Sequence, residues 1–189
     1  MSMREGFMFL HRFLGHPKRV GSAIPSSRFL AEQMVKPISW DHVQSIAELG
    51  SGTGAITRFL QAHAGDNVDI ILFEMDKQMR EYIRKQYPQF SCYANARHLY
   101  EKMQEQGIEA LDCVVSGLPF FNFGASTRRA LLDQVVQALK PGGLFITYQY
   151  SLQMKKMLAD TFVIEDIRFV PINMPPAFVY ICRKKNEQP

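Results

Sequence analysis

Three glycines alternate in the stretch AELGSGTGAITRF, where Gly50, Gly52 and Gly54 stand between an apolar run and a helical pattern. Glycine lets the backbone turn sharply and lets a ligand approach where a Cβ atom would clash. The amino terminus of the following helix favours negatively charged groups. Glu48 places a carboxylate just ahead of this loop, and Glu74 ends the next apolar run. A plain strand-to-helix turn does not need three alternating glycines, so the pattern predicts a ligand-binding loop.

Two classes of ligand fit this loop. The string GSGTGA matches the GxGxx(G/A) fingerprint of dinucleotide-binding enzymes, and Glu74 stands near the expected spacing of ~20 residues. The same string matches the (E/D)xGxGxG loop for S-adenosylmethionine. Three features favour the second class. Glu48 would repel a pyrophosphate but attract a cationic amino group or sulfonium, a Pro-Gly-Gly sequence at 141–143 precedes a late strand, and a hairpin ends the predicted sheet.

The elements that must position this loop alternate between strands and helices from Ser45 onward. Apolar runs predict strands at 44–50, 68–76, 89–95, 111–117 and 144–150, and the intervening patterns predict helices at 54–65, 77–86, 100–107, 126–143 and 151–160. Such alternation indicates a mostly parallel sheet covered on both faces. The last two extended runs, 162–170 and 177–182, are joined without a helix and can pair only antiparallel. We therefore expect an open, doubly wound α/β sheet that ends in a hairpin.

The amino-terminal segment, residues 1–40, is expected to form a separate lid, and residues 41–189 the ligand-binding domain. Within 3–14, apolar residues fall on one side of a helical wheel and charged residues mostly on the other, which predicts an amphipathic helix. A turn-rich linker follows, and SRFLAEQMV predicts a second short helix capped by Ser26 or Ser27. The amphipathic helix can pack on the domain as a lid or lie in a membrane interface.

The overall composition sets limits on the kind of protein. The chain has 189 residues, 47% of them hydrophobic and 21% charged, which suits one domain with an ordinary core. Its net charge of +4 is compatible with an anionic partner but does not require one. Cys92, Cys113 and Cys182 form no CxxC or Cys/His pattern, so we expect neither a disulfide nor a metal site. No run approaches the ~18 apolar residues of a membrane span. Polar residues interrupt the amino-terminal apolar patch, so we expect no signal peptide and a cytoplasmic location.

On these residues the chain, from about Val43 to its carboxyl terminus, resembles the class I S-adenosylmethionine-dependent methyltransferases, which have a Rossmann-like fold. The resemblance implies that Gly50, Gly52 and Gly54 cradle the methionine part of the cofactor. It implies that Glu74 accepts hydrogen bonds from both ribose hydroxyls, for which the two oxygens of a carboxylate are suited. The further cofactor contacts that the resemblance implies are Glu48, Ser51, Met75, Asn95, Ala96 and Ser116.

Three of these implied contacts differ in how they would act. Met75 would pack on the adenine ring. Asn95, in the string YANA, stands where the family often has an aspartate that accepts a hydrogen bond from the adenine amino group, and an amide oxygen can do this more weakly. Glu48 can either contact the cofactor directly or act as a structural cap for the loop.

A second segment, SGLPFFNFG at 116–124, lies at the end of a predicted strand, where ligands gather in this fold. Methyl transfer to an amine moves positive charge from sulfur to nitrogen, so the protein must align the two groups, exclude water and accept a cation. Aromatic faces suit a methylated ammonium, and Ser116 and backbone carbonyls can take the protons of the amine. We expect Phe120 near the substrate and Phe121 or Phe123 in the core.

Tyr148 and Tyr150 stand two residues apart at the end of a predicted strand, so their side chains lie on one face. They either supply rings or a hydroxyl near the amine or pack within the sheet. The candidate catalytic residues are therefore Ser116, Phe120 and Tyr148.

Two subfamilies share parts of these segments. Ribosomal RNA adenine dimethyltransferases carry an N-(L/I)-P-(F/Y) string here, but this chain has Ser116 or Gly117 in place of the Asn and lacks length for their helical carboxyl-terminal domain. Bacterial phospholipid N-methyltransferases share an SGLP…NF string. They also share an amino-terminal F-L-…-P-(K/R)-x-V-G-(S/A)-A-I-x-P-S-S segment, matched here by FLGHPKRVGSAIPSS. The chain resembles these enzymes more closely, over nearly its whole length.

The resemblance implies an enzyme that uses S-adenosylmethionine, with S-adenosylhomocysteine as product, to methylate the amine headgroup of a phospholipid such as phosphatidylethanolamine. It further implies a monomer that touches the inner face of the membrane and binds no nucleic acid. Two alternatives stay open: methylation of RNA adenine at N6, and a non-catalytic protein that keeps the cofactor fold. Salt-dependent RNA binding would favour the first alternative, and cofactor binding without methyl transfer would favour the second.

Overall fold

The computed structural model describes residues 23–173 and 175–186 of the chain. The predicted amphipathic helix at 3–14 lies outside the described residues, so the structure does not test it. The second predicted helix is present as α2 (Ala23–Val35), and it begins earlier than expected. Ser26 and Ser27 therefore lie within the helix rather than at its cap, which corrects the predicted start.

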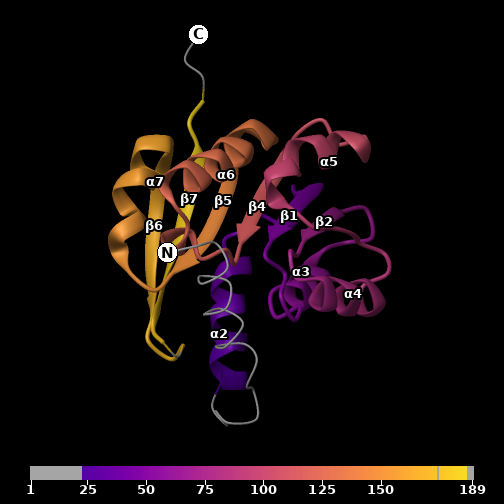
Figure 1. Cartoon of the computed structure of the whole chain (residues 1–189), viewed down its shortest axis with the longest axis horizontal. Coiled ribbons are helices and arrows are strands. Elements are labelled where there is room, and N and C mark those ends of the chain that lie inside the picture. Colours follow the sequence, from indigo (N-terminus) through magenta and orange to yellow (C-terminus); the bar gives the residue numbers. More distant parts are fainter. Residues whose placement is uncertain (1–22, 174, 187–189) are drawn as a thin grey trace.

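The strands of the described residues form one sheet in the order β3-β2-β1-β4-β5-β7-β6. The strands β1 to β5 pair in parallel, and β7 pairs antiparallel with both β5 and β6. The expected mostly parallel sheet ending in a hairpin is confirmed, and β7 lies between β5 and β6 (Figure 1). The bounds of the strands are β1 Ser45–Leu49, β2 Asp69–Phe73, β3 Ser91–Tyr93, β4 Leu111–Ser116, β5 Leu139–Gln149, β6 Phe162–Val170 and β7 Ala177–Lys184.

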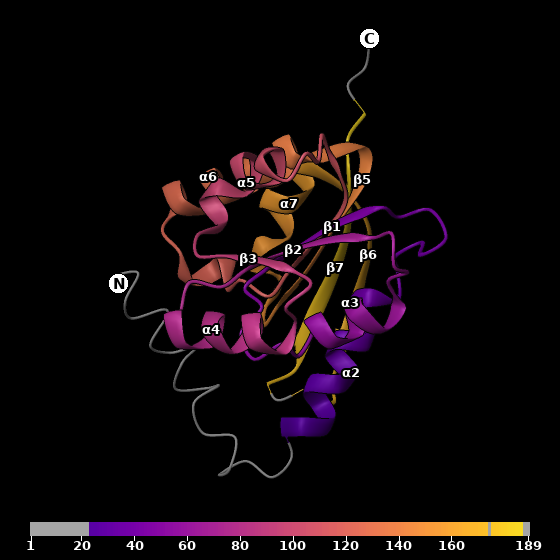
Figure 2. The ribbon, with the colours of Figure 1, turned by 90° about the vertical axis from the view of Figure 1, so that its right-hand side faces the viewer.

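Helices cover both faces of this sheet (Figure 2). One layer consists of α2, α3 (Thr57–His63) and α4 (Lys77–Gln86), and the other of α5 (Leu99–Glu105), α6 (Ala125–Ala138) and α7 (Lys155–Thr161). Each layer buries its own apolar cluster against the sheet, since a helix with one apolar face needs a partner surface. The described residues also contain three short 3-10 turns: η1 (Ala96–His98), η2 (Phe120–Asn122) and η3 (Leu152–Met154).

The helix α4 forms over the predicted range because its end signals are local. Its N-cap is Asp76, whose carboxylate accepts a hydrogen bond from the Met79 N–H at 2.9 Å. Pro88 follows two residues after the helix ends, and a proline disfavours helical backbone in the residue before it. The helix α6, in contrast, ends at Ala138, because the Pro-Gly-Gly sequence at 141–143 lies within β5 rather than after the helix.

The helix α2 is part of the core of the domain. Its residues Leu30, Ala31 and Met34 are buried in the same apolar cluster as Leu60 of α3 and Ile46 of β1. This portion of the expected lid segment therefore packs as a layer of the fold and supports the sheet from one face.

Candidate active site

The carboxyl ends of β1, β2, β4 and β5 lie side by side along one edge of the sheet. In the register of the strands, Leu49 stands next to both Phe73 and Ser116, and Ser116 stands next to Thr147. The segments that follow these strands contain the predicted ligand residues. The fold thus brings the glycine loop, Glu74, the segment 116–124 and Tyr148 to one edge, where open α/β sheets bind ligands.

The glycine loop depends on backbone angles that favour glycine. Gly50, Gly52 and Gly54 have φ values of +81°, +54° and +82°. A Cβ atom on Gly50 would lie 3.0 Å from Leu118 Cδ2, and one on Gly54 would lie 3.0 Å from the Tyr87 ring. A Cβ atom on Gly52 would meet nothing within 4 Å. The outer two glycines are therefore required by the packing of the protein, whereas Gly52 faces open space that a ligand can fill.

The Glu74 carboxylate joins the end of β2 to the glycine loop. It is buried, and its Oε2 accepts a hydrogen bond from the Gly52 N–H at 2.7 Å while its Oε1 accepts one from the Asp76 N–H at 2.8 Å. Burial raises the pKa of Glu74, and these two backbone donors oppose the rise. Each carboxylate oxygen can accept a further hydrogen bond. Glu74 is thus held in one position and keeps acceptor sites for a ligand diol.

Arg80 of α4, which was not among the residues predicted from the sequence, positions this carboxylate. Its Nη1 donates to the Glu74 carbonyl at 2.8 Å and to the Met75 carbonyl at 3.0 Å. The guanidinium thereby fixes the turn that carries both residues. The spacing of six residues from Glu74 was a usable signal, since an arginine in the first turns of α4 faces back toward the turn before the helix.

Glu48 is the most unusual titratable group at this edge. It is fully buried, and the Thr57 hydroxyl donates to its Oε2 at 2.6 Å. Within the described part of the chain, its Oε1 is buried without a hydrogen-bond partner. Burial raises the pKa of Glu48 from the usual 4.5 to about 7, and the neighbouring hydroxyls of Thr57 and Ser51 oppose this rise. A buried acceptor without a partner is costly, so this oxygen suits a cationic or hydrogen-bond-donating ligand group.

The remaining predicted cofactor residues lie around the same loops. The Ser51 hydroxyl is buried beside the Glu48 carboxylate and helps to lower the pKa of Glu48 against the effect of burial. Met75 is exposed beyond the end of β2, where it is free to cover a ligand. The Asn95 Oδ1 accepts a hydrogen bond from the Arg97 N–H at 3.0 Å and so caps η1, which begins at Ala96. That oxygen keeps one further acceptor site, so a contact with adenine stays a prediction.

The aromatic segment differs from the prediction. Phe120 is completely buried, with its ring edge-on to Phe145 at 6.1 Å between centroids and to Phe123 at 6.4 Å. Phe121 is the exposed ring of the segment. The expectation that Phe120 lies near the substrate is therefore corrected. Of the two candidate core rings, Phe123 is partly buried and packs against the apolar cluster, and Phe121 does not. The reason is the turn η2, which directs the Phe120 side chain under the helices and the next side chain outward.

The other two candidate catalytic residues are at the predicted edge. The Ser116 hydroxyl is fully buried and accepts a hydrogen bond from the Leu118 N–H at 3.2 Å, so its contact organises the loop. The Tyr148 and Tyr150 rings lie edge to face with centroids 5.7 Å apart, as expected for neighbours on one face of a strand. Burial raises the pKa of Tyr148 well above 10, so this phenol stays neutral and keeps its proton.

Gln149 also supports the loop, and the sequence analysis did not single it out. It is a buried amide at the end of β5, and its Nε2 donates to the Leu118 carbonyl at 3.0 Å and to the Thr147 hydroxyl at 3.3 Å. Since a carbonyl can only accept, the orientation of the amide is determined. Gln149 therefore ties the segment after β4 to the end of β5. A polar residue in the otherwise apolar run LFITYQY was the available signal.

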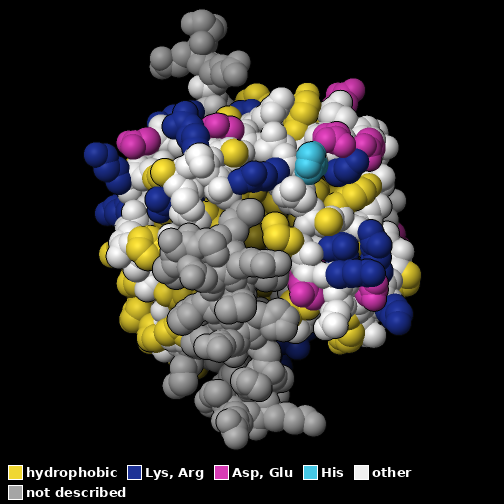
Figure 3. Space-filling view, viewed as in Figure 1, with side chains coloured by type: hydrophobic (Ala, Val, Ile, Leu, Met, Phe, Trp, Pro, Cys, Tyr) yellow, Lys and Arg dark blue, Asp and Glu magenta, His cyan; other side chains and the backbone are white. Residues whose placement is uncertain are grey.

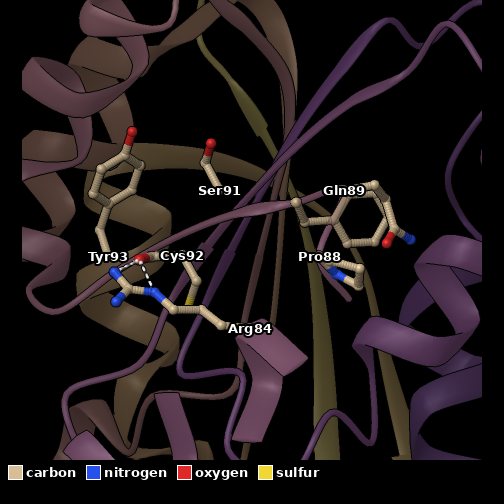
Figure 4. Close-up of a pocket in the computed structure, with 7 residues that line it drawn as sticks. Arg84, Pro88, Gln89, Ser91, Cys92 and Tyr93 are labelled. Atoms are coloured by element: carbon tan, nitrogen blue, oxygen red, sulfur yellow. Dashed lines mark hydrogen bonds between the residues drawn. The ribbon is translucent and has the colours of Figure 1, made fainter. Parts of the chain in front are cut away.

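A hollow beside the edge strand β3 is lined by residues of α4, of the loop 88–90 and of β3 (Figure 4). Beside it the guanidinium of Arg84 donates from Nε and Nη2 to the Cys92 carbonyl, at 3.2 and 2.6 Å. Since β3 is an edge strand, this contact covers a carbonyl that would otherwise be open to pairing with another strand. The hollow holds none of the predicted site residues. Its lining residues are Arg84, Pro88, Gln89, Phe90, Ser91, Cys92 and Tyr93.

Within the described ranges, no three His, Cys, Asp or Glu residues are grouped so that they could hold a metal ion. No helix in the described part of the chain is long and apolar enough to cross a membrane.

Known proteins are similar to this chain in sequence and in fold. A family described as "Methyltransferase domain" matches residues 46–143. The chain is 32% identical over 195 residues to the ornithine lipid N-methyltransferase of Singulisphaera acidiphila, covering 98% of this chain and 99% of that protein. The chain belongs to the class I S-adenosylmethionine-dependent methyltransferases.

Solved structures agree with this assignment at the level of the fold. The methyltransferase superposes on the N-methyltransferase NodS from Bradyrhizobium japonicum, in complex with S-adenosyl-l-homocysteine, with a TM-score of 0.71 and 16% identity over 95% of this chain and 98% of that one. It also superposes on TrmN from Thermus thermophilus with a TM-score of 0.63 and 16% identity, over 85% of this chain and 52% of that one. The expected Rossmann-like methyltransferase fold is thereby confirmed.

The site fits the cofactor S-adenosylmethionine, whose sulfonium supplies the methyl group. Two observations carry the fit: the space beside Gly52 that a Cβ atom would enter, and the buried Glu48 oxygen without a partner. Gly50 and Gly52 would follow the methionine part, Glu74 would hold the ribose diol, and Glu48 would face the ammonium group. At this edge the protein would contribute the orientation of the cofactor and the carboxylates of Glu48 and Glu74. The described residues hold no metal site there.

Replacing Gly52 with alanine is expected to weaken S-adenosylmethionine binding at least tenfold, because the new methyl group enters the space for the ligand. The change costs about 1–2 kcal/mol of stability through the left-handed backbone. Gly107→Ala is the matched control, since Gly107 also has positive φ, +73°, and open space around it, far from the site. Calorimetric titration compares the two variants after thermal melts establish equal stability. Equal affinities would contradict the assignment of Gly52.

Proposed function

We propose that this methyltransferase transfers methyl groups to the primary amine of a membrane-lipid headgroup, with phosphatidylethanolamine as the first candidate. The observation that supports this most is the similarity, over nearly the full length of both chains, to an ornithine lipid N-methyltransferase. Similarity outside residues 46–143 matters here, because the cofactor-binding part alone is common to methyltransferases of many substrates.

The segment after β4 suits an amine as the group that receives the methyl. The neutral amine needs a hydrogen-bond acceptor for its N–H groups, which fixes the direction of its lone pair, and the methylated ammonium product can release its proton to water, so no strong acid is needed. The Leu118 carbonyl is already occupied, since it accepts hydrogen bonds from the Phe120 N–H at 2.9 Å and from Gln149. Among the described residues, the neighbouring Gly117 carbonyl accepts no such bond. The Gly117 carbonyl is therefore proposed to accept a hydrogen bond from the substrate amine. Ser116 and Gln149 hold its loop in place.

The rings of Tyr148 and Tyr150 are placed to bind the methylated ammonium of the product. They line the end of β5 beside Gly117, where the distance from Tyr148 Cε1 to an ideal Cβ position on Gly117 is 3.7 Å. The face of a neutral phenol attracts an alkylammonium, and this attraction survives methylation, whereas hydrogen-bond donation weakens as N–H groups are replaced. Tyr148 thus takes the role that the sequence analysis gave to Phe120.

Two lipids share the required chemistry, a primary amine on a short flexible chain. The deciding experiment incubates the enzyme with labelled S-adenosylmethionine and vesicles that contain phosphatidylethanolamine, ornithine lipid or neither, followed by chromatography of the lipid fraction. Label in phosphatidylethanolamine supports the proposal in full. Label only in ornithine lipid would keep a lipid amine as the substrate but replace the proposed headgroup. Label in unmethylated ribosomal RNA and in neither lipid would overturn the proposal.

We further propose that the enzyme acts as a monomer at the inner face of the membrane.

A further inference from the structure

Large apolar side chains are exposed along the edge of the sheet that carries the active site. Phe121 in η2 is 50% exposed, Leu152 in η3 is 47% exposed, Phe169 at the end of β6 is 57% exposed, and Ile172 in the β6–β7 turn is 61% exposed. We call these four side chains the apolar rim. Isolated exposed apolar residues are normal on a soluble surface, but a group at one edge marks a site of interaction.

The sheet topology places all four at the same edge. The turns η2 and η3 contact each other, so Phe121 and Leu152 belong to neighbouring segments. The β6–β7 turn lies at this edge as well, because Phe178 of β7 pairs with Gln149, the last residue of β5, and with Phe169 of β6. Figure 3 shows hydrophobic side chains gathered at the lower left, over the part of the molecule where Figure 1 places this hairpin.

Basic side chains adjoin the rim. Lys155 and Lys156 begin α7 directly after η3, and both are exposed. Neither forms an ion pair with any described residue. Apolar side chains beside unpaired lysines match the layered chemistry of a membrane surface, where acyl chains lie under anionic phosphates. A protein partner would need its own carboxylates opposite these two lysines, whereas an anionic bilayer presents phosphates at every position along its surface.

We propose that the β6–β7 hairpin and the turns η2 and η3 form a membrane-docking surface, in which the apolar rim enters the interface of an anionic bilayer and Lys155 and Lys156 meet lipid phosphates. The inference rests on the proposed function, since a lipid headgroup must reach the edge of the sheet. Docking through this edge directs the mouth of the active site at the bilayer. The amine can then enter while the acyl chains stay in the membrane.

The test uses the full-length protein with vesicles of phosphatidylethanolamine and phosphatidylglycerol. The variant Phe169→Ser/Ile172→Ser is expected to lower the vesicle partition coefficient at least tenfold. Its affinity for S-adenosylmethionine and its turnover of a short-chain, monomeric phosphatidylethanolamine are expected to stay within twofold of the wild type. Val163→Ser is the matched control, because Val163 is 51% exposed on the same strand but lies at its opposite end, next to Arg183. It is expected to leave partition unchanged.

Two additional variants keep the outcome clear. Since the Phe169 ring contacts that of Phe178, at 5.1 Å between centroids, Ile172→Ser alone is also measured, and it is expected to lower partition about threefold without lowering the melting temperature. Lys155→Glu/Lys156→Glu is expected to weaken binding to anionic vesicles and to reduce its dependence on salt.

Unchanged vesicle partition in both hairpin variants would overturn the docking surface. So would a concentration-dependent dimer that the hairpin variants dissociate, because a second copy would then be the occupant of the rim. Partition that depends on the hairpin, in an enzyme that labels no lipid, would support the docking surface and contradict the proposed function instead. The two proposals thus fail through different measurements.

Discussion

Replacing Glu74 with alanine is expected to weaken S-adenosylmethionine binding by roughly 100-fold or more. The variant loses the two acceptors for the ribose hydroxyls, and each hydrogen bond to a charged group contributes about 1.5–3 kcal/mol. It also releases the Gly52 N–H, which Glu74 holds at 2.7 Å, so the glycine loop loses its link to β2. Calorimetric titration with S-adenosylmethionine and with S-adenosylhomocysteine measures the loss.

Two companion variants make this result specific. Glu74→Gln keeps one carbonyl acceptor and is expected to lose about tenfold in affinity, between the wild type and the alanine variant. Asp69→Ala is the matched control, since Asp69 is an exposed carboxylate at the other end of the same strand, and it is expected to bind the cofactor normally. A Glu74→Ala variant that stays folded and binds S-adenosylmethionine within threefold of the wild type would remove Glu74 from the site.

The variant Glu48→Gln is expected to make the ligand-free protein more stable at neutral and higher pH while it weakens cofactor binding. The pKa of Glu48 is raised from the usual 4.5 to about 7 in the folded protein. Between these two values the folded state holds a proton that the unfolded chain has released. The free energy of unfolding of the wild type therefore falls as pH rises from about 4.5 to about 7, by roughly 3 kcal/mol in total from this group.

Glutamine cannot ionise, so this loss of stability is absent from the variant. The unfolding free energy of Glu48→Gln, relative to the wild type, is expected to rise by roughly 3 kcal/mol between pH 4.5 and pH 8. Denaturant titrations at several pH values measure the difference. The charged and titratable groups nearby, Glu74 and Tyr87, are present in both proteins. Glu109→Gln, which changes an exposed carboxylate, is the control and is expected to show no such trend.

Cofactor binding is expected to respond to pH in the opposite direction. The ammonium group of S-adenosylmethionine favours the ionised form of Glu48, so the affinity of the wild type rises as pH increases through about 7. Glu48→Gln is expected to lack this rise and to bind more weakly at pH 8. A wild-type affinity that is constant from pH 5.5 to pH 8 would mean that Glu48 does not face the charge of the cofactor.

Several parts of this protein could be predicted from the sequence because their signals are local. The alternation of apolar runs with helical patterns predicts the layered sheet, and Pro88 predicts the end of α4. The three glycines beside Glu48 predict the loop, since positive φ angles limit the choice of residue whatever the rest of the fold. Such signals depend on neighbours in the chain, and a single sequence contains all of them.

The tertiary structure alone decided which side chains face the core and which face the site. The rings of Phe120 and Phe121 are chemically identical, yet η2 buries one beside Phe145 and exposes the other. The partner of Glu48 is Thr57, from α3, and the support of the loop after β4 is Gln149, from β5. These contacts join segments that only the packing of the sheet brings together. Burial and hydrogen-bond partners depend on distant elements, which is why the pattern along the chain could not specify them.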